Sequence, residues 1–406
     1  MSEQKKLVPV IEAQNQILSR LCDGKEIEIP IWGNTNIKLG YHGWPTICKG
    51  DGDTLYASAS LRIAHIDPYA VVVFMESHDK GYTWSEPKVV IQTPLDNRDS
   101  GCLYLGNGKL IVTTFTHDVK NYIGNEGAKW HGWQKLVSTE QLNAQVSKWD
   151  NLPAEAKLGG SYIVLSDDYG KTWSEPIRMP VKAPHGCSLA QDGKTALFFG
   201  PAVRPEMSGF TNLPGRDEWT PKGYFHLFAS EDAGHTWAYK SSVKLPDEGP
   251  ESFYDEGYCI QLKDGSYVAG IRSEKNHFGH WATFITRSED GINWTQPTPI
   301  YGPDGKEQWG APPHLLQLKS GALLLSYSWR HGDCGSRGRL SFDGGKTWGD
   351  EFIICISDQP QHGDLGYPST VELDDGTLIT ATYQAYKDDK CPSVLYTRWR
   401  LEEAAE

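Results

Sequence analysis

An eight-residue pattern, Ser-x-Asp-x-Gly-x-Thr-Trp, recurs along the chain and constrains its fold more than any other feature. Five copies are present, the fourth of them one residue shorter, and they begin at Ser77, Ser166, Ser230, Ser288 and Ser341. In such a turn the Ser and Asp side chains bond to the backbone, the Gly takes a positive φ and the Trp packs between sheets. We therefore interpret the copies as structural turns that close a repeated unit.

A second pattern alternates with the first: an apolar segment, a glycine turn and another apolar segment, which is typical of a β-hairpin. The six glycine turns lie at 50–52, 106–108, 192–193, 264–265, 320–321 and 375–376. Six hairpins and five closing turns predict six four-stranded units. Because units of this length cannot bury both faces alone, they stack radially. The sequence therefore predicts an all-β fold, a six-bladed β-propeller.

The predicted propeller is a single domain over residues 31–406, preceded by an N-terminal extension at 1–30. The spacing between the first two copies of the turn pattern is too long, and we place the excess in an insertion at about 118–160. Within it, Ser138-Thr-Glu-Gln141 is a capping-box pattern that predicts a short helix. Such an insertion is either a lid or binding loop, or a flap that packs over a blade edge.

Composition and charge exclude several classes of protein. The formal net charge of −13 disfavours a nucleic-acid partner. No run reaches the roughly 18 apolar residues of a membrane span, and residues 1–30 lack the order of a signal peptide, so we expect a soluble, cytoplasmic protein with no membrane partner. The eight cysteines form no CxxC pair and are interpreted as reduced thiols. No metal or cofactor is predicted, although Cys187 follows His185 by two positions and leaves a metal site as an alternative.

Residues just before the innermost strand of each blade should face the central funnel of a propeller. These stretches are more polar and aromatic than strand starts require, and they lie at 41–45, 96–99, 183–185, 254–258, 311–314 and 364–368. The candidate pocket residues among them are His42, Trp44, Arg98, Asp99, His185, Glu256, His314 and Tyr367.

Arginines end three of the strands that run back toward the same face. They are Arg62, Arg272 and Arg330, and Arg337 follows closely. Arginines that converge on a pocket in an acidic chain predict recognition of an anionic group, most simply a carboxylate held by bidentate hydrogen bonds. For any one of them, solvation or pairing with an aspartate is the alternative.

The turns and hairpins resemble the sialidase (neuraminidase) superfamily, whose six-bladed propellers carry such turns under the name of Asp boxes. The boxes cover Ser77 to Trp348, and the hairpins extend the match from about Trp44 to Tyr383. The resemblance implies an exo-acting glycoside hydrolase that removes a terminal acidic sugar, sialic acid or a related ulosonic or uronic acid, through a tyrosine nucleophile. Asp boxes also occur in other propellers, so the fold alone does not determine the function.

The resemblance also implies roles for single residues. Tyr367 stands where the family has its nucleophile, Glu256 where it has the glutamate that takes the phenolic proton, and Asp67 where it has the acid/base aspartate. Arg272 resembles one arginine of the substrate-binding triad, and Arg337 another. Each of the three catalytic candidates also has an ordinary interpretation, as a strand-start aromatic, a solvated loop carboxylate and a turn aspartate respectively.

Two further assignments in the triad stay open. Arg330 is an alternative to Arg337, and the first arginine is missing because the chain has Gly43-Trp44-Pro45 where the family has Arg-Ile-Pro. Arg98 or Arg62 could replace it, and the change leaves room for an acidic sugar other than sialic acid.

Three histidines, His42, His185 and His314, would further reshape the pocket. They also suit a rival function, a propeller lyase that removes the proton next to a uronate carboxylate. A second rival is a propeller that binds carbohydrate without turnover. The sequence does not determine the oligomeric state.

Overall fold

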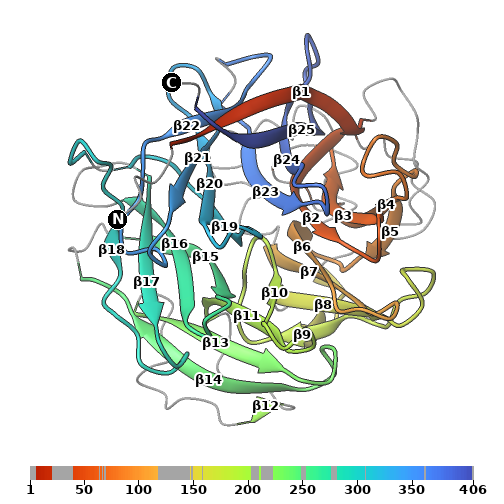
Figure 1. The fold of residues 1–406 in the computed structure, drawn as a ribbon. Coiled ribbons are helices and arrows are strands. Elements are labelled where there is room, and N and C mark those ends of the chain that lie inside the picture. The colour runs from red at the N-terminus through yellow and green to blue at the C-terminus, as the bar shows by residue number, and fades with distance from the viewer. Residues whose placement is uncertain are drawn as a thin grey trace.

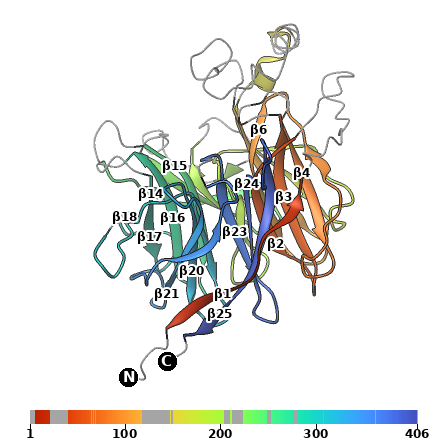
Figure 2. The ribbon, with the colours of Figure 1, turned by 90° about the horizontal axis from the view of Figure 1, so that it is seen from above.

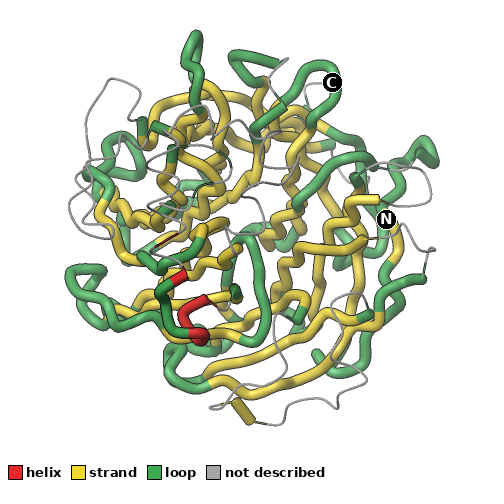
Figure 3. The backbone as a smooth tube through the Cα atoms, turned by 180° about the vertical axis from the view of Figure 1, so that it is seen from behind, coloured by secondary structure: helices red, strands yellow, loops and turns green. Residues whose placement is uncertain are grey.

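The computed structural model describes residues 6–20, 40–63, 65, 67, 70–117, 147, 150–157, 159–202, 210–211, 223–247, 253–275, 281–306, 308–360 and 363–404. Regular structure in these residues is almost entirely β, and helix is confined to short pieces within 147–157, including the 3-10 helix η3 (Ala154–Lys157) (Figure 3). The predicted helix at 138–141 lies outside the described residues. No helix in the described part of the chain is long and apolar enough to cross a membrane.

The first three blades follow one another along the chain, each as one antiparallel sheet whose first strand is innermost. Blade 1 consists of β2 (Tyr41–Lys49), β3 (Leu55–Arg62), β4 (Val71–Ser77) and β5 (Lys88–Ile91). Blade 2 consists of β6 (Asp96–Tyr104), β7 (Leu110–His117), β8 (Gly160–Ser166) and β9 (Ile177–Met179). Blade 3 consists of β10 (Cys187–Leu189), β11 (Ala196–Pro201), β13 (Tyr224–Ser230) and β14 (Trp237–Lys244), with the short parallel strand β12 (Phe210–Thr211) at its edge.

The remaining blades complete the circle in Figure 1. Blade 4 consists of β15 (Phe253–Gln261), β16 (Tyr267–Lys275), β17 (Ala282–Ser288) and β18 (Thr298–Pro299). Blade 5 consists of β19 (Pro313–Gln317), β20 (Leu323–Trp329), β21 (Gly335–Ser341) and β22 (Phe352–Ile356). Blade 6 consists of β23 (Gly366–Glu372), β24 (Leu378–Ala385), β25 (Pro392–Glu403) and β1 (Leu7–Ser19). The prediction of a six-bladed, all-β propeller is confirmed.

The two ends of the chain meet in blade 6. Strand β1 pairs antiparallel with β25 along most of its length, from Leu7 opposite Glu403 to Ser19 opposite Val394. Figure 2 shows both strands leading to the termini at the lower end of the molecule. Part of the segment that the sequence predicts to be an extension is therefore the outermost strand of the last blade, and it closes the circle of sheets.

The turn patterns form the local structures that their residues predict. In the first copy the Gly81 N–H donates to Ser77 Oγ at 2.9 Å, and the backbone N–H and hydroxyl of Thr83 donate to the two carboxylate oxygens of Asp79 at 2.9 and 2.6 Å. The indole of Trp84 donates to Gly81 O at 3.1 Å. The Ser, Asp and Thr bonds recur in the other three full-length copies, and in the short copy an asparagine side chain replaces the threonine hydroxyl.

The hydrophobic core is divided among the six interfaces between neighbouring blades. Each interface holds one cluster of buried apolar side chains contributed by both of its blades. Side chains at the ends of inner strands add polar links: Gln261, Gln317 and Glu372 each accept the backbone N–H of a residue in the preceding blade. Since apolar burial is satisfied between the blades, the propeller axis is left for polar and aromatic residues.

The inner strands β2, β6, β10, β15, β19 and β23 contact one another in this order around the axis, and β23 contacts β2. They are the strands that the sequence predicts to be innermost. The pairing of Asp96 with His117 and of Thr116 with Gly160 places the end of β7 and the start of β8 at the mouth where the inner strands begin. The helical turn η3 stands above that end of the molecule, opposite the termini (Figure 2).

Candidate active site

Four inner strands lose their regular register just where they start, at the mouth of the central channel. The irregular segments contain Trp44, Asp99, Glu256 and Tyr367. Trp44, Asp99 and Tyr367 have φ values of 50°, 26° and 55°, which residues other than glycine rarely adopt. Because a bulge redirects a side chain out of the alternation of its strand, four blades deliver a functional group to one place. These four residues are all among the sequence-predicted candidates.

Tyr367 and Glu256 form the centre of the site. The Tyr367 hydroxyl donates to Glu256 Oε1 at 2.5 Å, and Arg272 Nη1 donates to both Tyr367 Oη and Glu256 Oε2 at 2.8 Å. All three side chains are buried. The second terminal nitrogen of Arg272 pairs with Glu274 at 2.7 Å. The tyrosine oxygen is therefore held between a proton acceptor and a cation.

The electrostatic environment fixes the protonation states of this group. Burial, together with Asp99 and Glu256, raises the pKa of Tyr367 well above its usual range, so the phenol is neutral in the resting site. Burial opposes the charge of Arg272, but Glu256, Tyr367 and Glu274 together outweigh it and raise its pKa. Arg272 consequently stays charged beside an oxygen that becomes negative if Tyr367 loses its proton.

Asp99 is a second carboxyl group of the same site. Burial and the neighbouring Glu256 carboxylate raise the pKa of Asp99 to about 8. Its side chain is buried, and Oδ1 has no hydrogen-bond partner among the described residues. Two carboxyl groups that share a buried site divide their roles because both cannot ionise at little cost. Asp99 is the one that keeps its proton at neutral pH.

Of the two rival arginines of blade 5, the structure brings Arg330 and not Arg337 to Tyr367. Arg330 Nε and Nη2 donate to Leu365 O at 3.0 and 2.9 Å, two residues before the tyrosine, and its charge opposes the rise in the pKa of Tyr367. Arg337 pairs with Glu351 at 2.5 Å and stacks on Trp329, with 4.1 Å to the ring centroid. The prediction that Arg337 is the better match is therefore not supported by its position on β21, the third strand from the axis.

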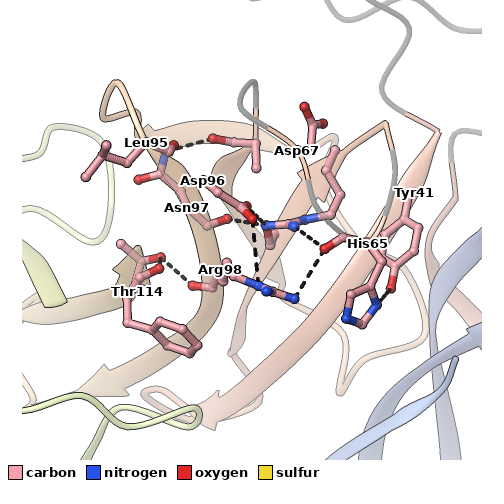
Figure 4. Close-up of polar contacts among 12 residues, drawn as sticks. Tyr41, His65, Asp67, Leu95, Asp96, Asn97, Arg98 and Thr114 are labelled. Carbon is pink, nitrogen blue, oxygen red and sulfur yellow. Dashed lines mark hydrogen bonds and ion pairs between the residues drawn. The ribbon is translucent and has the colours of Figure 1, made fainter. Parts of the chain in front are cut away.

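Arg62 and Arg98 both lie against the ring of Trp44. Arg62 is fully buried and pairs with Asp96 at 2.8 Å. The guanidinium carbons of Arg62 and Arg98 lie 4.5 and 4.9 Å from the Trp44 ring centroid, so two cations contact one indole. Both arginines donate to the backbone oxygen of His65, at 2.8 and 3.2 Å, as Figure 4 shows for Arg98. Both arginines are buried, Arg62 completely and Arg98 with 8% of its surface exposed.

Asp67, the predicted acid/base, is turned into its own loop. Its Oδ2 accepts the Ile63 N–H at 2.5 Å, and only 1% of the residue is exposed. In Figure 4 its carboxyl group is directed away from Arg98 and His65.

Sequence reasoning missed a polar cluster between blades 1 and 6. Asp364 accepts hydrogen bonds from the hydroxyls of Tyr41 and Tyr383 at 2.9 and 3.1 Å, and His65 Nδ1 lies 3.0 Å from its Oδ1. Burial opposes the charge of Asp364, but His65 and the two hydroxyls hold its pKa below the usual range. Tyr41 and Tyr383 also pack on Trp44, with ring centroids 5.7 and 5.4 Å away. The signal was present, because Tyr41 and Asp364 fall within two of the predicted funnel-facing stretches.

The three predicted histidines lie inside the protein. His42 bonds to Ser19 Oγ at 2.8 Å, and burial lowers its pKa to about 3. His185 and His314 make an edge contact at 5.1 Å between ring centroids, and the His185 ring is 6.1 Å from that of Tyr367. Burial lowers the pKa of both. Both rings are therefore neutral, and the ring of His185 lies next to that of Tyr367.

Among the residues that the structure describes, no group of three or more His, Cys, Asp or Glu side chains is arranged to hold a metal ion. The alternative of a metal bound by His185 and Cys187 gains no support from their placement.

Comparisons with known proteins agree with this architecture. The family model of the BNR repeat-like domain matches residues 129–380, and no curated protein matches the chain. A protein of unknown function from Dyadobacter fermentans shares 18% identity at a TM-score of 0.67, over 98% of this chain and 99% of that one. The NanB sialidase of Streptococcus pneumoniae has 13% identity and a TM-score of 0.57 over 93% and 71% of the two chains. The α-L-arabinanase of Penicillium chrysogenum, complexed with arabinobiose, has 12% identity and a TM-score of 0.57 over 96% and 98%. At these identities the similarity establishes the fold.

Proposed function

Because this chain belongs to the family of BNR repeat-like domains, we propose that it is a glycoside hydrolase with Tyr367 as its nucleophile. The observation that carries the proposal is the contact of the Tyr367 hydroxyl with Glu256 at 2.5 Å and with Arg272 at 2.8 Å. Sialidases and an arabinanase among the solved structures of similar fold support glycoside hydrolysis as the reaction class.

In this mechanism Glu256 takes the phenolic proton as the tyrosine oxygen attacks the anomeric carbon. A neutral phenol approaches an anionic sugar without the repulsion that a carboxylate nucleophile would meet. Arg272 donates to the same oxygen and stabilises the negative charge that develops on it. The covalent intermediate is then hydrolysed by water.

Asp99 is the general acid in this proposal, in place of Asp67. A pKa raised to about 8 by burial and by Glu256 keeps Asp99 protonated at neutral pH, as an acid that protonates the leaving oxygen must be. Asp67 is instead occupied by the backbone of its own loop. After the first step, the Asp99 carboxylate can accept the proton of the attacking water.

The substrate that we propose carries a terminal acidic sugar, with its carboxylate near Arg272 and Arg330. These are the two cations that the structure associates with Tyr367, and Arg98 lies against Trp44. Gly43 occupies the sequence position of the missing first arginine, and Trp44 follows it. The carboxylate is therefore held by fewer arginines than in the triad that the sialidase resemblance implies, which favours a related ulosonic or uronic acid over sialic acid.

A neutral sugar such as arabinose is the second candidate, and a specific observation favours it. Arg272 and Arg330 donate to protein acceptors, Glu256 and Glu274 for Arg272 and the Leu365 carbonyl for Arg330, so their hydrogen bonds are already engaged without a substrate carboxylate. The arabinanase of similar fold points the same way. The lyase alternative gains nothing from His185 and His314, since both are buried below the site.

The test is a panel of 4-methylumbelliferyl glycosides of sialic, other ulosonic and uronic acids and of α-L-arabinofuranose, with uronate-containing oligosaccharides beside them. Released fluorophore reports hydrolysis, and new ultraviolet absorbance reports an unsaturated lyase product. We expect hydrolysis of one acidic glycoside, and a loss of more than about 100-fold in kcat for Tyr367→Phe. Hydrolysis of the arabinoside alone would replace the acidic substrate with the neutral one.

The matched control is Tyr301→Phe, which removes a hydroxyl from a half-exposed tyrosine of blade 4. It should turn over substrate like the parent protein. Unchanged turnover in Tyr367→Phe would refute the nucleophile assignment, and absorbance without fluorophore release would replace the hydrolase with a lyase.

A further inference from the structure

Two cysteines from neighbouring blades lie in sulfur-to-sulfur contact at the far end of the channel. Cys48, near the end of β2, and Cys102, near the end of β6, have their Sγ atoms 3.4 Å apart. A parallel contact two residues earlier fixes the same strands, because the Thr46 hydroxyl donates to Ser100 O at 2.8 Å. The packing of β2 against β6 therefore holds the two thiols close together.

The pair is open to small molecules from one side. A cavity of about 390 Å³ is lined by the last residues of all six inner strands, and both cysteines are among them. It lies at the opposite end of these strands from Tyr367. Cys48 is half-buried, whereas Cys102 is buried. A reagent of the size of a short peptide can therefore reach Cys48 first.

We infer that Cys48 and Cys102 are a modification site at which a low-molecular-weight disulfide is reduced and an intramolecular disulfide is formed. The Sγ atoms need to approach by about 1.4 Å to reach the bonding distance of a disulfide. Neither residue takes part in the proposed hydrolysis, so this inference does not depend on the proposed function.

The reaction proceeds in two balanced exchange steps. The Cys48 thiolate attacks the reagent disulfide, forms a mixed disulfide and releases one reagent thiolate. The Cys102 thiolate then attacks Cys48 Sγ, the bond between Cys48 and the reagent breaks, and the second reagent thiolate leaves. Two protein thiols are oxidised and one reagent disulfide becomes two thiols. Burial, with the contact to Cys48, raises the pKa of Cys102, so the second step should accelerate with rising pH.

The test uses the full chain, reduced, freed of reductant and incubated with oxidised glutathione. Thiols are counted after denaturation, and peptides are mapped by mass spectrometry without reduction. We expect loss of two of the eight thiols, with the peptides of Cys48 and Cys102 linked and free of glutathione. Cys102→Ser should keep glutathione on Cys48, because the resolving thiol is gone. Cys48→Ser should leave Cys102 unmodified.

The matched control is Cys391→Ser, which removes another half-buried thiol that lies outside the cavity. It should form the link between Cys48 and Cys102 as the parent chain does. Three outcomes would overturn the inference: glutathione that stays on Cys48 in the parent chain, a link from Cys48 to Cys187 on the same cavity wall, or eight free thiols after exposure.

Discussion

Replacing Asp99 by asparagine should change how the stability of the protein depends on pH. Burial and Glu256 raise the pKa of Asp99 to about 8 in the folded protein, against about 3.9 in an unfolded chain. Between these two values the folded state holds a proton that the unfolded state has released. Its contribution to stability is therefore complete below the unfolded pKa and is lost as the pH rises through the folded one.

The size of the effect follows from the difference between the folded and unfolded pKa values of Asp99. Each pH unit between the two pKa values costs the folded state about 1.4 kcal/mol, which sums to on the order of 5 kcal/mol over the whole range. Asparagine keeps the shape of the protonated carboxyl and removes the titration. The stability of Asp99→Asn relative to the parent protein should therefore rise from about pH 4 to about pH 8 and then level off.

Urea unfolding at several pH values measures this difference directly. Asp364→Asn is the matched control, because the pKa of Asp364 is shifted in the opposite direction. Its loss of stability should be constant between neutral pH and about pH 8, an interval in which the Asp99 effect still grows. Glu256→Gln should weaken the pH dependence of the parent protein, because Glu256 contributes to the raised pKa of Asp99. Equal slopes for the parent protein and Asp99→Asn would refute the argument.

Three further substitutions test the scaffold. Asp79→Ala removes the acceptor of three hydrogen bonds within its own turn. It should lower the free energy of unfolding by about 1–3 kcal/mol, measured by urea titration. Asp388→Ala, at an exposed position, should change that free energy little. Gly101→Ala places a Cβ 2.4 Å from the backbone of a neighbouring glycine and should lower the free energy of unfolding by more than about 3 kcal/mol. Gly40→Ala, whose Cβ meets nothing within 4 Å, should be tolerated. Equal thermal midpoints for the two variants would contradict this. Trp44→Arg adds a third guanidinium beside two that lie 4.5 and 4.9 Å from the indole and should destabilise the protein by about 3 kcal/mol or more. A melting temperature equal to that of Trp44→Phe would disprove this.

The fold could be predicted because its repeated turns are self-contained. The carboxylate of Asp79 accepts hydrogen bonds from residues at most four positions away, so a short stretch of sequence contains every residue that the turn needs. The closure of the circle could not be predicted in this way. Strand β1 has no such turn, and it finds its place by pairing with β25 at the other end of the chain.

The same distinction applies to the candidate site: the local sequence locates some of its residues and not others. A glycine turn follows each inner strand, so the start of that strand could be located before the turn, and with it Tyr367, Glu256 and Asp99. The choice between the two arginines of blade 5 could not, because it depends on distance from the axis. Arg330 follows the end of β20 at the channel mouth, whereas Arg337 lies within β21, one strand further out. Sequence spacing does not show how far each arginine lies from the propeller axis.

The replacement of the first arginine is part of a larger rearrangement. Trp44 is packed by Tyr41 and Tyr383, both of which donate to Asp364. An arginine at Gly43, the position of the missing residue, would place its Cβ 2.9 Å from the ring of Tyr41. The buried cation Arg62 is already paired with its own carboxylate, and the neutral indole of Trp44 gives it an aromatic face. Under the proposed function, a sugar carboxylate is therefore left to the cations beside Tyr367.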